Sequence, residues 1–240
     1  MSARFMELLR DLKAGLFDFA FPGSCRVCNR SLSSPERFAC ETCLITIPAL
    51  EAPFCLNCRA ILNSAGKHCG CKTFLKGTYS LWTYSEEVES LIHHFKYKGK
   101  TLLGQKLSSL LAENLRQLDV FPGLDLLIPV PLFPSRRRER GFNQAEIISR
   151  VIADSHGLRV ENKVLKRDRN TRNQTQLSAL ERKENVRNAF SPGSSGALVN
   201  KSVLLVDDVT TTGATLCECA RVLQEAGVKE VYACTLAVAV

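Results

Sequence analysis

The segment VLLVDDVTTTGAT, from Val203 to Thr215, indicates both the fold and a ligand site. Its first four residues are apolar, which is typical of a strand that is buried on both faces of a parallel sheet. Two carboxylates follow, then a hydroxyl-rich loop with Gly213, and then a helical pattern that runs to Ala226. Open α/β sheets bind ligands at the carboxyl ends of their strands. The segment therefore predicts a ligand site at the end of a buried strand.

The chemistry of this segment suits a phosphorylated sugar. Backbone N–H groups and hydroxyls of a small loop can surround a phosphate, and the following helix adds its positive N-terminal end. The adjacent carboxylates can accept hydrogen bonds from sugar hydroxyls. An ordinary strand-to-helix connection with a threonine cap would explain one threonine and one aspartate, but not two acids followed by three threonines and a glycine. The chain contains neither a Walker loop nor a dinucleotide fingerprint.

Apolar periodicity around the segment predicts an α/β protein. Strands are expected at 79–84, 126–130, 203–206 and 231–238, and helices at 86–97, 102–118, 144–156 and 214–226. Alternating strands and helices favour a mostly parallel sheet that helices cover on both faces. No helix is expected in the cysteine-rich region. Residues 1–21 are apolar but interrupted by charges at helical spacing, which indicates a short amphipathic helix and not a signal peptide.

Eight of the eleven cysteines lie in four pairs between residues 25 and 71. Two cysteines separated by two residues can bind one zinc ion through a tight turn, and two such turns complete a tetrahedron. We expect a structural role for zinc, with one or two ions, because so short a region buries little apolar area. Sequential pairing is favoured over crossed pairing because its loops are shorter. His68 lies beside the fourth pair and is an alternative to Cys69 or Cys71 as a ligand. The expected ligands are Cys25, Cys28, Cys40 and Cys43, then Cys55, Cys58, Cys69 and Cys71.

Charge and cysteine usage narrow the functional class. The formal net charge is +8, and eight thiolates with two divalent ions would lower it to +4. Most of the excess lies between residues 130 and 190, where 14 basic side chains face 7 acidic ones. A basic surface there suits the phosphates of a small ligand or of a nucleic acid. No apolar run reaches the roughly 20 residues of a membrane span. Eleven cysteines without a secretion signal indicate a reducing, cytoplasmic setting, where paired cysteines are more often metal ligands than disulfides.

Several motifs resemble known families. Val203–Thr215 resembles the phosphoribosyl pyrophosphate (PRPP) signature of type I phosphoribosyltransferases. Residues 128–132 (IPVPL) and 136–146 (RRRERGFNQAE) resemble the ComF family of competence proteins, which includes the GntX-type proteins of gluconate utilisation. Further matches are 95–99 (FKYKG), Arg167-x-Arg169-x-Thr171-x-x-Gln174, Ser178 with Arg182, and 185–190 (NVRNAF). The cysteine pairs match the family's zinc ribbon, except for the one-residue gap of the fourth pair.

The resemblance implies a type I phosphoribosyltransferase fold. It places an N-terminal helix and a double zinc ribbon in residues 1–76 and the phosphoribosyltransferase-like domain in residues 77–240. It implies that the catalytic acids Asp207 and Asp208 contact the ribose hydroxyls of PRPP, with magnesium bridging the ligand's oxygens. The 5′-phosphate would lie on Val209, Thr210, Thr211, Thr212, Gly213, Ala214 and Thr215. The pyrophosphate loop would be Pro129, Val130, Pro131 and Leu132.

Displacement at the anomeric carbon needs cations that neutralise the departing pyrophosphate. Arg140 is the first candidate, because a guanidinium fork fits phosphate oxygens. Further candidates for pyrophosphate or DNA contact are Lys96, Arg136, Arg137, Arg138, Arg167 and Arg169. The alternative for the arginine run is a solvated helix face or turn. Asn143 and Gln144 are expected to order the loop through hydrogen bonds, and Cys217 and Cys219 to pack in a helix.

Three functions are compatible with these features. The first is a PRPP-binding ComF protein that acts in natural transformation, where it would contact single-stranded DNA beside a helicase-like ComF partner. The second is an active phosphoribosyltransferase with an unidentified acceptor, including a role in gluconate metabolism. The third is a DNA-binding module without catalysis.

Overall fold

A computed structural model of the chain describes residues 23–32, 38–62, 69–97, 101–171, 178–194 and 198–239. The expected helix at 1–21 and the alternative ligand His68 lie outside these ranges. In chain order the elements are β1 (Gly23–Ser24), β2 (Ser31–Leu32), α2 (Glu41–Thr46), β3 (Gly77–Thr83), α3 (Glu86–Tyr97), α4 (Thr101–Gln117), β4 (Leu126–Pro129), α5 (Pro134–Arg140), α6 (Gln144–His156), β5 (Arg159–Val160), β6 (Leu165–Arg167), α7 (Ala179–Val186), β7 (Phe190–Pro192), β8 (Ser202–Thr210), α8 (Ala214–Glu225) and β9 (Glu230–Val238).

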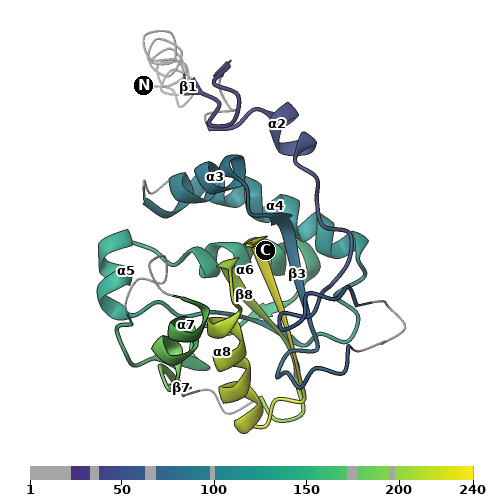
Figure 1. Cartoon of the computed structure of the whole chain (residues 1–240), viewed down its shortest axis with the longest axis vertical. Coiled ribbons are helices and arrows are strands. Elements are labelled where there is room, and N and C mark those ends of the chain that lie inside the picture. The colour runs from purple at the N-terminus through teal and green to yellow at the C-terminus, as the bar shows by residue number, and fades with distance from the viewer. Residues whose placement is uncertain are drawn as a thin grey trace, which may run out of the picture.

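The centre of the molecule is a five-stranded sheet with the order β3-β9-β8-β4-β5. Every pairing in it is parallel, as the sequence predicted. The carboxyl ends of β3, β9, β8 and β4 therefore meet at one edge (Figure 1). Strand β8 lies in the middle and is longer than expected, because it continues through the two aspartates to Thr210.

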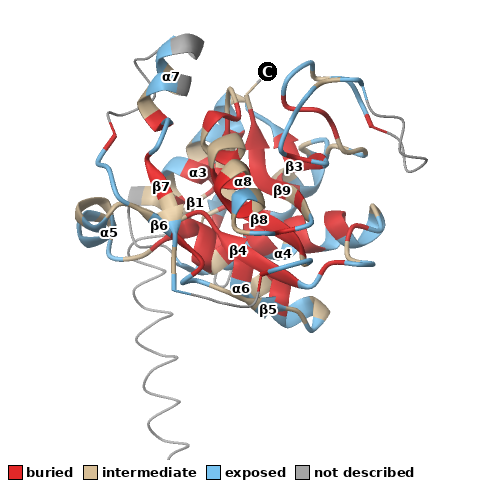
Figure 2. Ribbon diagram, turned by 90° about the horizontal axis from the view of Figure 1, so that it is seen from below, coloured by how far each residue is buried: buried red, intermediate tan, exposed pale blue. Residues whose placement is uncertain are grey.

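Alternate residues of β8 face two different hydrophobic cores. Leu204 and Val206 are fully buried on the side of α3, α4 and α6. Val203 and Leu205 are fully buried on the side of α8. Since side chains alternate along a strand, burial on both faces explains why the sequence here is continuously apolar. Figure 2 shows this buried sheet between α8 on one face and α4 and α6 on the other.

The expected helices are confirmed within a residue or so at each end. Helices α3 and α6 have the predicted bounds, and α6 begins at the cap Asn143 and ends before Gly157, whose φ is 64°. Arginines 136–138 lie on the short helix α5, which starts with Pro134 and ends before Gly141. The expectation of no helix among the cysteines was wrong. Helix α2 forms there because the Cys40 sulfur accepts a hydrogen bond from the Cys43 N–H and so caps it.

The cysteine-rich part packs on the domain and shares its cores. Cys25, Cys40 and Leu44 belong to the core beside α3 and α4. Phe54 and Leu56 belong to the core beside α8. Isolated bridges pair Ala49 with Trp82 and Phe54 with Thr78, so the segment runs along strand β3. The two parts are therefore continuous in packing, although β3 begins at Gly77, directly after the expected boundary.

Strands β6 and β7 form a separate, small antiparallel pair, and α7 lies between them in the chain. This pair brings Arg167, at the end of β6, next to Phe190 on β7, with the guanidinium carbon 5.3 Å from the ring centre. Within the described ranges, no helix combines the length and apolarity that crossing a membrane requires.

Candidate functional site

A cavity of about 440 Å³ lies at the carboxyl edge of the sheet. Residues from the ends of β3, β4, β6, β8 and β9 meet there with residues from α3, α5, α7 and α8. The site residues predicted from the sequence that line it are Asp207, Asp208, Val209, Thr211, Thr215, Val130, Leu132, Lys96, Arg136, Arg140 and Arg167. Segments that are far apart in the sequence thus provide one site.

The loop after β8 leads directly into helix α8. Gly213 has a φ of 75° and occupies the cap position of the helix. The Thr212 hydroxyl accepts a hydrogen bond from the Ala214 N–H, at 3.4 Å. The N-terminus of this 12-residue helix therefore begins at the loop, where its dipole and free N–H groups attract an anion. Thr211 and Thr215 face the cavity, whereas Thr212 and Ala214 face a second hollow.

The two aspartates differ in their surroundings. Asp208 is 9% exposed, and its Oδ2 lies 3.1 Å from the Lys96 ammonium. Asp207 accepts a hydrogen bond from the Asp208 N–H, at 2.9 Å. Burial and the charge of Asp208 raise the pKa of Asp207 to about 7. The pair thus combines one carboxylate that a cation neutralises with one that gains or loses a proton near neutral pH.

Two buried side chains hold the basic wall of the cavity. Gln144, which is 1% exposed, accepts a hydrogen bond from Arg140 at 3.2 Å and donates one to the Lys96 carbonyl at 3.4 Å. Asn143 donates to the Val130 carbonyl at 3.0 Å while it caps α6. As the sequence predicted, these two amides order the loop, and neither lines the cavity.

Arg167 also lines the cavity. Its guanidinium donates a hydrogen bond to the Thr171 hydroxyl at 2.6 Å. Burial lowers the pKa of Arg167, and the negative charge of Asp207 opposes that shift. In total the lining of the cavity includes five cationic side chains and three carboxylates. The excess of positive charge suits a ligand with several negative charges.

Other predicted residues lie elsewhere. Arg137 forms a two-point ion pair with Glu146, at 2.5 and 3.1 Å. Arg169 donates to the carbonyl oxygens of Glu184, Asn185 and Arg187 and so braces the end of α7. Arg138 lines a hollow of about 690 Å³ beside the loop after β4. That hollow is also lined by Pro131, Leu132, Arg137, Lys166, Arg167 and Asp168.

The structure adds cavity residues that the sequence did not identify. Tyr84, which the sequence placed at the end of a strand, lies directly after β3, and Glu89 lies on α3. Burial, followed by the charge of Glu89, raises the pKa of Tyr84 and keeps its phenol protonated. Asn170 and Thr171 join them from the segment that follows β6. No periodicity or spacing marks Tyr84, Glu89 or Asn170, because each reaches the cavity through tertiary packing, whereas Thr171 belongs to a motif quoted above.

The eight cysteines form two quartets, and this confirms the sequential pairing. In each quartet all four sulfur atoms lie within 4.8 Å of one another. Tetrahedral zinc with bonds of about 2.3 Å sets its sulfur ligands about 3.8 Å apart, and the sulfurs of Cys28 and Cys40 are 3.9 Å apart. The residues therefore fit zinc. We call them the first cluster (Cys25, Cys28, Cys40, Cys43) and the second cluster (Cys55, Cys58, Cys69, Cys71).

Local backbone geometry assists both clusters. Burial acts to raise the pKa of Cys25, but the backbone N–H groups of Cys28 and Cys40 outweigh it and lower that pKa to about 6. This favours the thiolate that zinc requires. The one-residue gap of the fourth pair is spanned by Gly70 with a φ of 74°. A left-handed glycine lets the flanking cysteines point to one centre without strain.

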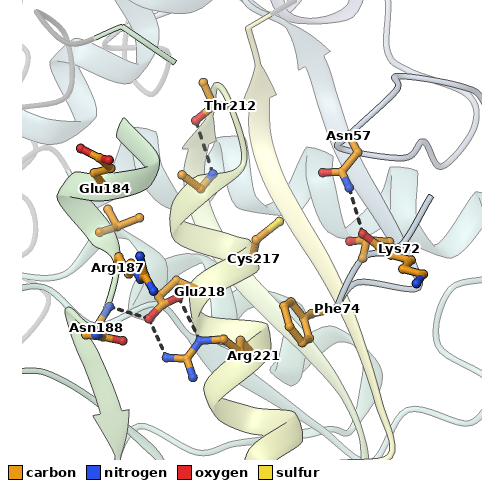
Figure 3. Close-up of a pocket in the computed structure, with 13 residues that line it drawn as sticks. Asn57, Lys72, Phe74, Glu184, Arg187, Asn188, Thr212, Cys217, Glu218 and Arg221 are labelled. Carbon is orange, nitrogen blue, oxygen red and sulfur yellow. Dashed lines mark hydrogen bonds and ion pairs between the residues drawn. The ribbon is translucent and has the colours of Figure 1, made fainter. Parts of the chain in front are cut away.

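A further hollow, of about 550 Å³, lies beside the loop that joins β8 to α8 (Figure 3). Asn57, Lys72 and Phe74 from the second-cluster segment face Thr212 and helix α8 across it. Burial and the charge of Asp207 raise the pKa values of Cys219 and Cys234, which are fully buried. Both are packing residues, as expected for Cys219.

Comparisons with known proteins agree with this geometry. Residues 138–239 match the phosphoribosyl transferase domain family. Competence protein F of Haemophilus influenzae is 33% identical over 223 residues, which are 89% of this chain and 96% of that protein. DNA utilization protein YhgH of Salmonella typhi is 28% identical over 86% of this chain and 92% of that protein. Competence protein ComFC of Streptococcus pneumoniae is 26% identical over 83% and 87%.

Proposed function

Because the chain belongs to the competence protein F family, we propose that it binds PRPP at the carboxyl edge of its sheet and handles single-stranded DNA in natural transformation. One observation carries the PRPP assignment. The acid pair, the loop at the start of α8 and five cations line the same cavity. A sugar that bears a phosphate at one end and a pyrophosphate at the other presents the complementary groups.

Each part of PRPP has a partner in this proposal. The 5′-phosphate lies on the loop from Thr210 to Thr215, where N–H groups and the helix dipole stabilise it. The ribose hydroxyls donate to Asp207 and Asp208. The pyrophosphate lies along Val130 to Leu132, facing the cations of Lys96, Arg136, Arg140 and Arg167. The hydrogen bond from Asn143 to the Val130 carbonyl holds that loop in place.

The donor set also fits magnesium, which prefers oxygen ligands and retains much of its water. Asp207 is the better-suited carboxylate, because the Lys96 ammonium already pairs with Asp208. When bound, magnesium would supply positive charge to the phosphate oxygens. The raised pKa of Asp207 means that the carboxylate forms fully only above about pH 7 in the absence of such a cation.

If transfer occurs, the bond between the anomeric carbon and the pyrophosphate oxygen breaks, and an acceptor forms a new bond to that carbon. Positive charge then develops on the ribose ring, beside the acid pair, while negative charge leaves toward Arg140 and Arg167. Catalysis would rest on positioning and electrostatics, with no nucleophile from the protein. The two buried thiols with raised pKa values are unsuited to attack.

The DNA role rests on the names of the relatives and on the basic hollow beside the loop after β4. Arg138, Lys166 and Arg167 line that hollow next to Leu132, and Leu132 and Arg167 also line the cavity. Phosphates of a single strand would thus pass beside the PRPP site. We propose a cytoplasmic setting, with a helicase-like ComF protein as partner that delivers or receives the strand.

The first test is calorimetric titration of the purified zinc-loaded protein with PRPP and magnesium. We expect Asp207→Asn combined with Asp208→Asn to lower the affinity at least about hundredfold, because the charged acceptors for the ribose hydroxyls are removed. Zinc content should stay at two ions per chain. Wild-type affinity in the double variant would refute the assignment of the acid pair. If the wild-type protein binds PRPP, an assay of pyrophosphate release with candidate acceptors distinguishes an enzyme from a PRPP sensor.

The second test measures binding of single-stranded DNA against salt concentration. Arg138→Ala with Lys166→Ala should weaken binding and reduce the slope of log K against log salt by up to about 1.4, since each phosphate contact to a single strand contributes about 0.7. Arg159→Ala, which removes an exposed arginine that pairs with Glu161 outside the hollow, serves as the matched control. An unchanged slope in the double variant would exclude this surface as the DNA site.

A further inference from the structure

The second cluster lies directly against the phosphate loop. Leu56, between two of its cysteines, is 5% exposed and packs in the core beside α8. A Cβ atom placed on Gly213 would lie only 2.7 Å from the Leu56 Cδ1 atom. The segment makes another contact with α8, where Gln224 donates to the Phe74 carbonyl at 3.0 Å. The loop therefore rests on the cluster.

Arg59 joins the cluster to the site through its guanidinium. Its Nη2 donates hydrogen bonds to the Thr211 carbonyl, in the phosphate loop, and to the Ala239 carbonyl, at the end of β9. Its Cζ lies 5.9 Å from the centre of the Phe54 ring. Both acceptors belong to residues that line the cavity. One side chain thus links the second cluster to two strand ends of the site.

The backbone conformation of Arg59 indicates a functional role for its side chain. In the first cluster, the residue after the second cysteine is Asn29, with a φ of 59°. In the second cluster the same position holds Arg59, with a φ of 62°. Asparagine tolerates this left-handed conformation and arginine does so poorly. The turn after the second cysteine has this left-handed conformation in both clusters. In the second cluster a residue type that disfavours the conformation occupies the position.

The contacts also have an electrostatic and a geometric consequence. The described partners of Arg59 are two neutral carbonyls and an aromatic ring, and its Nη1 is buried without a hydrogen-bond partner among the described residues. An anion in the loop would balance this charge. In a trans peptide the N–H points opposite to the preceding C=O, so fixing the Thr211 carbonyl also fixes the direction of the Thr212 N–H.

We propose that Arg59 is a positioning residue of the phosphate loop, and that the second cluster, through Arg59 and Leu56, is part of the PRPP site and not only a folding aid. The proposal rests on the proposed function, since it concerns the half of that site that holds the 5′-phosphate. It predicts that the affinity for phosphate at the loop depends on metal at the second cluster. The first cluster, which contacts α3 through the hydrogen bond from Ser90 to the Arg26 carbonyl, has no such role.

The test compares Arg59→Ala with Asn29→Ala, which places the same residue at the equivalent position of the other cluster. Ribose 5-phosphate probes the loop, and magnesium pyrophosphate probes the opposite end of the cavity. We expect Arg59→Ala to weaken ribose 5-phosphate at least about tenfold, because the hydrogen bonds of a charged donor are lost. Pyrophosphate affinity should change less than about twofold, and Arg59→Lys should recover part of the loss. Asn29→Ala should change neither affinity.

Each result separates the two proposals. If the wild-type protein binds neither PRPP nor ribose 5-phosphate, the proposed function fails. If the wild type binds both and Arg59→Ala binds ribose 5-phosphate normally, only the positioning role of Arg59 is overturned. Equal losses for the two probes would mean general destabilisation and would also overturn it. Should Arg59→Ala fail to fold, Arg59→Met replaces it, because methionine keeps an apolar stem and removes the charged donor of both hydrogen bonds. Normal ribose 5-phosphate affinity in that variant would overturn the proposal.

Discussion

The two cysteine clusters have the same local design but different surroundings. In the first, the Cys25 N–H bonds to the Arg30 carbonyl and the Asn29 N–H to the Cys25 carbonyl, at 2.8 and 2.9 Å. In the second, Cys55 and Arg59 make the corresponding bonds to Ala60 and Cys55, at 2.9 and 2.8 Å. The first packs into the core of α3, α4 and α6, whereas the second packs beneath α8 and the phosphate loop.

The difference shows how one small metal motif can serve two purposes. A left-handed residue other than glycine costs about 1–2 kcal/mol, and less for asparagine. The first cluster avoids most of that cost and contributes buried residues to the core beside α3 and α4. The second accepts the cost at Arg59 and obtains contacts with two strand ends of the cavity. We therefore expect the first cluster to affect mainly folding stability and the second cluster to affect ligand affinity as well.

The largest expected effect comes from removing one ligand of each cluster. Cys28→Ser and Cys58→Ser are matched, because both change the exposed second cysteine of a knuckle. Each should lose one zinc ion, since serine is a poor ligand. We expect Cys58→Ser to lower PRPP affinity about hundredfold, which is about 2.7 kcal/mol, because the support of the loop is released. The PRPP affinity of Cys28→Ser should stay within about threefold of the wild-type value.

Zinc content by metal analysis and PRPP affinity by calorimetry check this pair. A large loss of affinity in Cys28→Ser would show that the clusters act together through the fold. Normal PRPP affinity in Cys58→Ser, together with loss of zinc, would show that the loop between β8 and α8 keeps its conformation without metal at the second cluster.

Much of this arrangement was predictable from local patterns. The strand ending in two aspartates, the Gly213 turn and the cysteine pairs are short-range signals, and each predicts one element or one cluster. Lys96, Arg140 and Arg167 were candidates, and all three line one cavity with the acid pair. Parallel strands make such convergence predictable, since their carboxyl ends share an edge.

Arg59, Tyr84 and Glu89 were not predictable in this way. The contact of Arg59 with Ala239 joins residues 180 positions apart. No periodicity or spacing encodes it, because it depends on how the second cluster docks on the sheet. One signal was present: an arginine stands where a zinc knuckle favours glycine or asparagine. Helix α2 was missed for a related reason, since its cap is a cysteine and not one of the usual capping residues.

A smaller effect tests the contact between the second cluster and the loop. Gly213→Ala introduces a Cβ atom that would meet Leu56 and also forces alanine into a φ of 75°. Gly157→Ala is the matched control, because its φ is 64° and nothing lies within 4 Å of the added atom. We expect the control to cost about 1 kcal/mol in unfolding free energy from backbone strain alone. Gly213→Ala should cost about 2–3 kcal/mol, since overpacking adds to the strain.

A double-mutant cycle isolates the steric part. In a Leu56→Ala background the added methyl of Gly213→Ala has room, so its cost should fall toward that of Gly157→Ala, with a coupling of about 1–2 kcal/mol. Denaturant titration measures these differences, and ribose 5-phosphate binding should decline in Gly213→Ala but not in Gly157→Ala. A coupling free energy near zero would mean that the Leu56 side chain moves away from the added methyl group without cost. The second cluster would then influence the site through Arg59 alone, and the affinity of Leu56→Ala for ribose 5-phosphate should equal that of the wild type.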